Sequence, residues 1–203
     1  MYFNVSSIEC LRREFSVDYT LTKREQVSFL ARAFLVSELK KQGFSFDFNI
    51  ETTPKGKPYF VNKRDMFFSL SHTADFVAVA FSLRSIGIDI EHSRKGMEAV
   101  VNRFFHSGER EYVFSQAELI TAASDEGDMT STQIFDRIAT QLWTVKEAYV
   151  KMTGTGIANN FSSVDLSPEN FNPNQNYVKE NARIISYYDK EKDLFVSLAI
   201  SLV

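Results

Sequence analysis

The stretch Ile86-Gly87-Ile88-Asp89-Ile90-Glu91 alternates isoleucine with glycine and acidic residues. This period of two predicts a β-strand whose Ile88 and Ile90 side chains face the protein interior. Asp89 and Glu91 then share the opposite face, where two neighbouring carboxylates repel each other unless a cation lies between them. Hard oxygen ligands suit Mg²⁺, although acidic pairs are also common on solvated edge strands. The stretch therefore predicts a strand and offers a candidate metal site.

A second informative segment lies in a helix predicted from about Gln133 to Gly154. Its apolar stripe has helical spacing and consists of Ile134, Ile138, Leu142, Val145, Tyr149 and Met152. Glu147 and Lys151 are four residues apart on the far side of this stripe, and Trp143 lies four residues before Glu147. A solvated Glu–Lys pair would explain the charges but not the tryptophan. We therefore expect this face to meet the other half of the protein or a ligand.

Outward from these two segments, the pattern mixes helices and strands in each half of the chain. A capping box of Thr22 and Glu25 begins a helix that extends to Lys41, and Phe44 to Glu51 alternates as a half-buried strand. Helical spacing returns between Glu98 and Ile120, before a polar connection at residues 121–132. Further strands are expected at Ile86–Ile90, Phe161–Leu166, Ala182–Tyr188 and Leu194–Val203. The prediction is an α+β fold of two similar halves, residues 1–84 and 85–203.

Composition narrows the class of protein. The chain has 203 residues, 28 aromatic ones (19 Phe, 8 Tyr and 1 Trp) and a net charge of 23 − 26 = −3, which disfavours nucleic acid as the main partner. The single cysteine, Cys10, excludes an internal disulfide framework and fits a reducing compartment. The apolar runs are strand-sized, the longest being Phe76–Phe81, and the N-terminus has no signal-peptide pattern. A cytoplasmic protein without a membrane span is expected.

Two polar segments could bind an anion. Ser69-Leu70-Ser71-His72-Thr73 offers hydroxyls and an imidazole to phosphate oxygens, although a plain polar turn or a Ser–His nucleophile pair are alternatives. Lys55-Gly56-Lys57-Pro58 is a basic turn, and Lys23 and Arg24 begin the first long helix. Neither a Gly-x-Gly-x-x-Gly motif nor a Walker loop is present, which disfavours ordinary dinucleotide and P-loop sites.

Taken together, five motifs resemble those of the Sfp-type 4′-phosphopantetheinyl transferases, in the same order and with sensible spacing. They are Gly56-Lys57-Pro58, Phe68-Ser69-Leu70-Ser71-His72-Thr73, Ile86-Gly87-Ile88-Asp89-Ile90-Glu91, Arg103-Phe104-Phe105 and Trp143-Thr144-Val145-Lys146-Glu147-Ala148-Tyr149-Val150-Lys151. Each motif is weak alone, but the ordered series, from about Lys23 to Gly156, covers about two-thirds of the chain. The resemblance implies two α/β halves related by a pseudo-twofold axis within a monomer.

The resemblance also implies an activity and a site. Such an enzyme moves the phosphopantetheine group of coenzyme A to a serine of an acyl or peptidyl carrier protein and releases adenosine 3′,5′-bisphosphate. Mg²⁺ would be held by Asp89, Glu91 and Glu147, and the catalytic pair would be Glu147 and Lys151. The implied coenzyme A contacts are Arg24, Lys55, Gly56, Lys57, Pro58, Ser71, His72 and Lys151.

Chemical reasoning leaves some choices open. Glu147, acting directly or through a water, is the first candidate for the base that deprotonates the carrier serine. Lys151 is the alternative base, but it would have to lose its charge beside phosphates. An inactive coenzyme A or nucleotide-binding protein of the same fold, and a Mg²⁺-dependent phosphohydrolase, are the competing functions.

Overall fold

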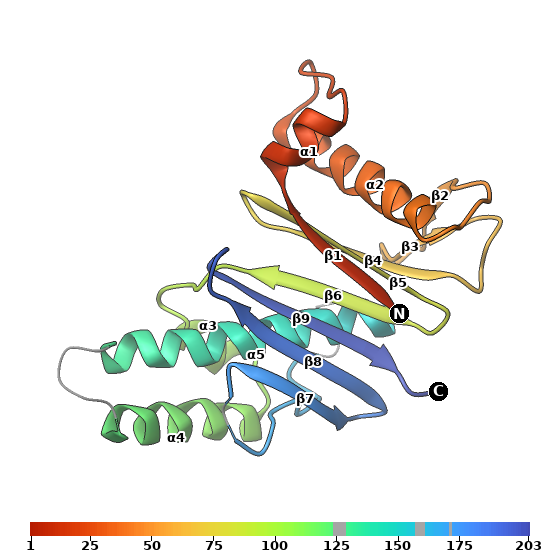
Figure 1. Cartoon of the computed structure of the whole chain (residues 1–203). Coiled ribbons are helices and arrows are strands. Elements are labelled where there is room, and N and C mark those ends of the chain that lie inside the picture. The colour runs from red at the N-terminus through yellow and green to blue at the C-terminus, as the bar shows by residue number, and fades with distance from the viewer. Residues whose placement is uncertain (124–128, 157–160, 171) are drawn as a thin grey trace.

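The computed structural model describes residues 1–123, 129–156, 161–170 and 172–203. Two antiparallel sheets pack face to face at the centre of the molecule, and helices cover their outer faces (Figure 1). The first sheet has β5 (Phe76–Ser82) in the middle, with β1 (Tyr2–Ser7) and β4 (Phe67–His72) beside it. The result is a mixed α+β fold, as the residue pattern predicts.

The second sheet has four strands in the order β6-β9-β8-β7. It is built from β6 (Ile86–Glu91), β9 (Leu194–Ser201), β8 (Ala182–Asp189) and β7 (Asn174–Lys179). The middle of β6 pairs with the middle of β9, with Asp89 opposite Ser197. Because β6 lies at the edge of this sheet, one of its main-chain sides faces away from the ladder.

Helices form the two outer layers. On the first sheet lie α1 (Ile8–Glu14) and α2 (Lys23–Lys41). On the second lie α3 (Glu98–Phe104), α4 (Ser107–Ala123) and α5 (Ser131–Thr153), with α5 directly against β6 and β9 (Figure 1). A short hairpin of β2 (Ile50–Thr52) and β3 (Pro58–Phe60) stands at the end of the first sheet. Within the described residues no helix is both long and apolar enough to cross a bilayer.

The core between the sheets follows directly from the period of two in β6. Ile86, Ile88 and Ile90 are almost fully buried and pack against Ala78 and Ala80 of β5. Small residues on β5 let the second sheet come close to the first. The predicted inward face of β6 is therefore confirmed, and the acidic face is turned toward α5.

Gly87 explains how closely α5 lies on β6. A Cβ built on Gly87 would lie 1.9 Å from the carbonyl oxygen of Ala148 and 2.6 Å from the amide nitrogen of Met152. Both contacts are with main-chain atoms of the helix, which cannot rotate away. The absence of a side chain at Gly87 therefore fixes the separation of the strand and the helix that carry the acidic motifs.

The helix α2 begins as the sequence predicts, whereas α5 begins at Ser131, two residues before the predicted start near Gln133, because Thr130 caps it there. The capping box of Thr22 and Glu25 is present, and α5 ends at Gly154 in the left-handed conformation (φ 70°). The helical region after Glu98 is broken at His106, whose amide nitrogen donates to the Glu109 carboxylate at 2.8 Å. This bond caps the start of α4 and separates it from α3.

Two predicted strands are wrong. Only residues 50 and 51 of the stretch Phe44–Glu51 join a ladder, as part of β2. Residues 44–49 keep alternating burial because their phenylalanines pack beside α2 without a partner strand. Residues 161–166 form a turn and an irregular segment instead of a strand. Part of the polar connection at 121–132, residues 124–128, lies outside the described residues.

Candidate active site

A cleft of about 370 Å³ lies between the C-terminal part of α5 and the turn that joins β2 to β3. The turn contributes the basic motif from Lys55 to Pro58, and α5 contributes Glu147 and Lys151. The two sequence motifs are about 90 residues apart along the chain (147 − 57 = 90) but form opposite walls of one cavity. Six of the predicted site residues are therefore brought together.

Asp89 is a buried acid that is bonded to Lys151, one of the residues that line this cleft. It is 7% exposed, and its Oδ1 atom accepts hydrogen bonds from Ser71 Oγ and from Lys151 Nζ, each at 2.7 Å. Lys151 Nζ also donates to the carbonyl oxygen of Ile88 at 3.2 Å. Three elements, β4, β6 and α5, thus hold one carboxylate in place.

Two serines of β4 accept hydrogen bonds from main-chain amides on the side of β6 that has no neighbouring strand. The amide nitrogen of Ile88 donates to Ser69 Oγ at 3.1 Å, and that of Ile90 donates to Ser71 Oγ at 3.3 Å. Both serines are buried. These side-chain acceptors replace a neighbouring strand, so that the buried edge of β6 does not carry unsatisfied donors.

Burial and the negative charge of Asp89 raise the pKa values of two further glutamates, Glu91 and Glu147. Burial, followed by the negative charge of Asp89, raises the pKa of Glu147 from 4.5 to about 7. Burial and the charge of Asp89 likewise raise the pKa of Glu91, and the positive charge of Arg94 partly offsets this rise. Negative charge is therefore concentrated where β6 meets α5, and a bound cation would relieve the repulsion.

Asp89, Glu91 and Glu147 do not converge on one point as the ligands of a preformed metal site would. Among the residues that the structure describes, no three His, Cys, Asp or Glu side chains converge as metal ligands. Lys151 instead supplies the positive charge nearest to Asp89, through the 2.7 Å ion pair. The donor set of hard carboxylate oxygens still has the chemistry that Mg²⁺ prefers.

Lys57 crosses from the turn to the end of α5. Its Nζ atom donates to the carbonyl oxygen of Met152 and, at 3.0 Å, to Ser85 Oγ. Its aliphatic stem passes Gly154, where a Cβ would lie 2.9 Å from the Lys57 Cδ atom. Burial lowers the pKa of Lys57 from 10.5 to about 8. Lys57 therefore connects the two walls of the cleft.

The other predicted contacts lie around the cleft or outside it. Ser71 and His72 are at the end of β4, where Ser71 is bonded to Asp89 and His72 is exposed. Arg24 lies exposed in the first turn of α2 and does not line the cleft. Their proposed contacts with coenzyme A remain predictions.

Trp143 has a different environment from the one expected. Its ring packs against Phe105 and Phe161, with centroids 6.5 and 4.7 Å away, and Arg94 lies 5.6 Å from it. All these residues belong to the second half of the chain, so the tryptophan itself does not meet the first half. The expectation for this helix face holds at Glu147, which lines the cleft with residues 55–58.

Several lining residues were not identified from the sequence as site residues. They are Phe68, Ser69, Leu70, Val150, Gly154 and Gly156. Ser69 and Leu70 belong to a motif already quoted, but the motif alone does not tell which side chains face the cleft. The two glycines have positive φ angles of 70° and 79°, and glycine at a helix end is a usable signal of a tight turn.

Comparison with known proteins identifies the class to which this fold and site belong. The sequence model of the 4′-phosphopantetheinyl transferase superfamily matches residues 85–202, which is more than half of the chain. The chain belongs to this superfamily. The match includes β6 and α5, which carry Asp89 and Glu147.

Individual relatives point to the same family. The chain is 33% identical over 113 residues to the 4′-phosphopantetheinyl transferase psf-1 of Bacillus pumilus, covering 56% of this chain and 42% of that protein. It is 31% identical over 112 residues to Sfp of Bacillus subtilis, covering 55% and 44%. It is 30% identical over 125 residues to the L-aminoadipate-semialdehyde dehydrogenase-phosphopantetheinyl transferase of Saccharomyces cerevisiae, covering 58% and 42%. The chain thus matches well under half of the length of these relatives.

Proposed function

We propose that this protein transfers the 4′-phosphopantetheine group of coenzyme A to a serine of an acyl or peptidyl carrier protein. The observation that supports it best is the cleft in which Glu147 and Lys151 of α5 face the basic turn from Lys55 to Pro58. Residues 1–84 would bind much of coenzyme A, and residues 85–203 would carry the metal and catalytic groups. One chain supplies both walls, so the proposed active unit is a monomer.

The transfer joins two changes at phosphorus. The carrier serine oxygen attacks the β-phosphate of coenzyme A, forming a new P–O bond while its proton passes to the base. The bond to the bridging oxygen of the pyrophosphate breaks, and adenosine 3′,5′-bisphosphate leaves with the electron pair. Glu147 is the proposed base, acting directly or through a water, because its carboxylate lines the cleft beside Lys151.

Positive charge is needed on both the transferred and the departing phosphate. We assign Asp89, Glu91 and Glu147 as the residues that would hold Mg²⁺, which would neutralise phosphate charge when bound. Lys151 is already paired with Asp89, and it would add positive charge at the same place. Lys55 and Lys57 line the opposite wall, where they would attract the phosphates of coenzyme A.

The cellular setting follows from the same proposal. Coenzyme A and carrier proteins meet this enzyme in the cytoplasm, and the single cysteine, Cys10, is exposed and unpaired, as expected in a reducing compartment. Neither a nucleic acid nor a membrane is part of the proposed reaction.

Mass spectrometry of carrier proteins tests the proposal. The full chain is incubated with apo carrier proteins, coenzyme A and Mg²⁺, and the masses of the carriers are measured. We expect at least one carrier to gain the mass of one phosphopantetheine group. Glu147→Gln and Lys151→Met should each reduce the rate by about 100-fold or more. The matched exposed controls, Glu118→Gln and Lys190→Met, should retain full activity.

Two other outcomes would contradict the proposal. Release of inorganic phosphate without modification of any carrier would indicate a phosphohydrolase. Calorimetric binding of coenzyme A with no covalent product from any carrier would indicate a binding protein of this fold.

A further inference from the structure

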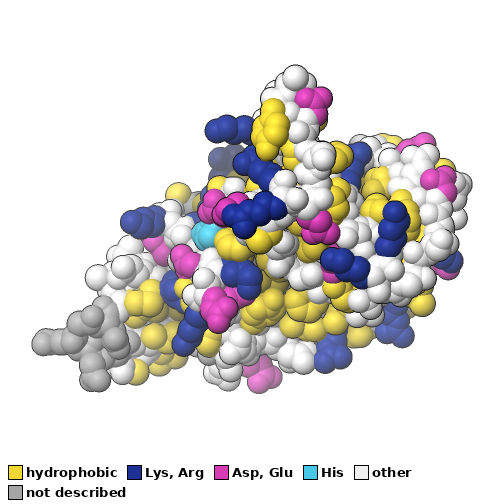
Figure 2. All heavy atoms as spheres, turned by 45° about the horizontal axis from the view of Figure 1, so that its top comes forward, with side chains coloured by type: hydrophobic (Ala, Val, Ile, Leu, Met, Phe, Trp, Pro, Cys, Tyr) yellow, Lys and Arg dark blue, Asp and Glu magenta, His cyan; other side chains and the backbone are white. Residues whose placement is uncertain are grey.

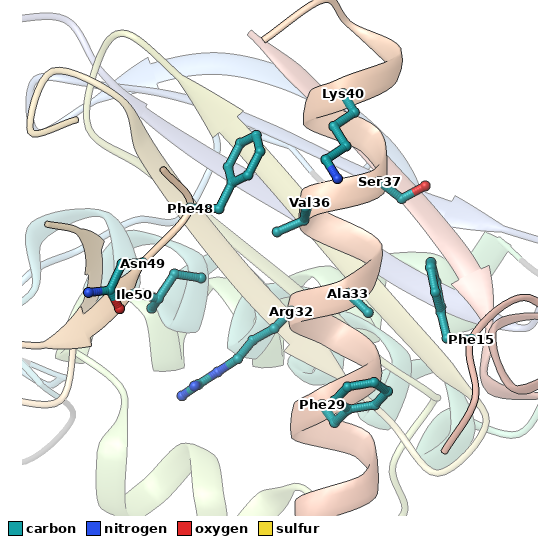
Figure 3. Close-up of a pocket in the computed structure, with 10 residues that line it drawn as sticks. All are labelled: Phe15, Phe29, Arg32, Ala33, Val36, Ser37, Lys40, Phe48, Asn49 and Ile50. Atoms are coloured by element: carbon teal, nitrogen blue, oxygen red, sulfur yellow. The ribbon is translucent and has the colours of Figure 1, made fainter. Parts of the chain in front are cut away.

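The outward side of α2 carries a second apolar stripe. Phe29, Ala33 and Val36 follow one another at intervals of four and three residues, which is the spacing of a helix that packs against another helix, and Lys40 lies four residues further on the same side. Phe29 is 42% exposed, although it is a large aromatic residue. Beside this stripe and the segment of residues 48–50 lies a groove of about 560 Å³ (Figure 3).

The walls of the groove are apolar on both sides. Phe15, which follows α1, closes one side, and Phe48 and Ile50 close the other (Figure 3). In Figure 2, which turns the end of the molecule with α1 and α2 forward, apolar side chains reach the surface among both basic and acidic side chains. The groove is therefore an exposed apolar surface.

Arg32 and Lys40 are the charged residues among those that line the groove. Neither side chain has an ion pair within the part of the chain that the structure describes. The nearest lining hydroxyl, Ser37, donates to Glu14 at 3.3 Å, and the same carboxylate oxygen lies 4.0 Å from Lys41. Glu14 does not line the groove, so the lining contains two positive charges and no carboxylate.

Other carboxylates near the wall strand are also engaged elsewhere. Asp47 accepts a hydrogen bond from Asn62 at 2.7 Å, and Glu51 accepts one from Tyr59 at 2.8 Å. The lining of the groove itself holds two cations and no carboxylate, although the whole chain has a net charge of −3. Charge complementarity favours an occupant that carries carboxylates.

The groove and the cleft are separate cavities, the first lined by α2 and residues 48–50 and the second by α5 and residues 55–58. The inner face of α2, including Leu35, packs with Val79 of β5, whereas Ala78 and Ala80 face the second sheet. No residue lines both cavities. An occupant of the groove would therefore leave the transfer site open.

We propose that this groove is the docking site for an amphipathic helix of a partner protein, with acidic residues flanking its apolar stripe. From Phe29 to Lys40 the helix axis advances by 11 residues, or about 16 Å. This length would accommodate about three turns of a partner helix. Apolar side chains of the partner would lie against Phe29 and Val36, and its carboxylates would reach Arg32 and Lys40. The inference is independent of the proposed transfer reaction.

Fluorescence anisotropy with two synthetic peptides tests the docking site. Both peptides are 18-residue amphipathic helices with the same leucine stripe, one flanked by glutamates and the other by lysines. The full chain should bind the acidic peptide at least about tenfold more tightly than the basic one, because only the acidic flanks pair with Arg32 and Lys40. Arg32→Glu should abolish the preference, because one lining cation would then be offset by one lining anion. Lys190→Glu makes the same charge change at an exposed residue that does not line the groove, and it should leave the preference unchanged.

Three results would overturn the proposal. They are equal or undetectable binding of the two peptides, equal weakening by Lys190→Glu, and a dimer in sedimentation that Val36→Arg dissociates. The last result would identify a second copy of the chain as the occupant. Because the variants lie outside the cleft, unchanged circular dichroism and carrier modification would show that any effect is local.

Discussion

Lys146 and Glu109 form an ion pair whose two side chains are 1% and 0% exposed. Lys146 Nζ lies 2.7 and 2.9 Å from the two carboxylate oxygens and also donates to the carbonyl oxygen of Val164 at 3.0 Å. The same carboxylate accepts from the amide nitrogens of His106 and Leu166. One buried pair therefore ties together α4, α5 and the segment that follows α5.

Removing one partner of this pair should be strongly destabilising. Lys146→Met leaves the Glu109 carboxylate buried without its cation, and we expect the free energy of unfolding to fall by about 3–5 kcal/mol. Urea denaturation followed by circular dichroism measures this loss. Lys192→Met, which removes a partly exposed ion pair with Asp189, serves as the control and should cost about 0–1 kcal/mol.

A double substitution separates the pair from simple packing. Glu109→Leu together with Lys146→Met removes both charges, so it should cost less than the sum of the two single changes. Additive losses would show that the two charges do not stabilise each other.

Gly87→Ala should prevent normal packing of α5 on β6. The added methyl group would overlap main-chain atoms of Ala148 and Met152, so we expect loss of the cooperative thermal transition or a large fall in its midpoint. Gly108→Ala is a suitable comparison, because its Cβ would meet the end of the Asp165 side chain, which can move. A stable Gly87→Ala protein would contradict the close contact.

Ser69 and Ser71 allow the positioning of Asp89 to be measured separately from sheet stability. Each serine accepts a hydrogen bond from a β6 amide, so each alanine variant should lose about 1–3 kcal/mol of unfolding free energy. Only Ser71 also donates to Asp89. We therefore expect Ser71→Ala to require more Mg²⁺ for half-maximal carrier modification than Ser69→Ala. An equal requirement in both variants would exclude a role for Ser71 in orienting Asp89.

Burial of the charged Lys57 ammonium should reduce the free energy of unfolding, and this reduction should shrink as alkaline pH removes the charge. Its pKa is about 8 in the folded protein and about 10.4 in an unfolded chain, so between these values the unfolded chain binds more protons. The free energy of unfolding, measured as wild type minus Lys57→Met, should accordingly rise from pH 8 to pH 10 and be flat below pH 7. Lys55→Met is the control, and a flat difference for Lys57→Met would show that burial does not affect this ammonium.

Regular periodicity made most of the fold predictable. The apolar stripe and the glycine at its end define most of α5, and the period of two defines β6, because each pattern reports a nearby buried face. Residues 44–49 show the limit of this reasoning. Alternating phenylalanines indicate alternating burial, but a strand also needs a hydrogen-bonding partner, which the sequence does not specify. The strand β1 went unpredicted for a related reason: its partner, β5, is about 70 residues away.

The candidate site was only partly predictable. Motif spacing placed Asp89 and Glu91 on one face of a strand and Glu147 and Lys151 on one face of a helix. The bond between Ser71 and Asp89 depends on how the two sheets pack, and no local pattern reports that packing. The burial of Lys57 against the end of α5 likewise follows from contacts between distant segments.

The two serine hydroxyls on β4 also occupy a strand edge that could otherwise pair with another chain. A fragment that begins at residue 85 would keep β6 but lose Ser69 and Ser71, and the amides of Ile88 and Ile90 would be free to pair with another chain. The isoleucine face of β6 would lose its cover at the same time. Such a fragment would combine an open strand edge with an apolar surface, which are the two features that promote intermolecular β-sheet. The first half of the chain therefore covers both the open edge and the apolar face of β6.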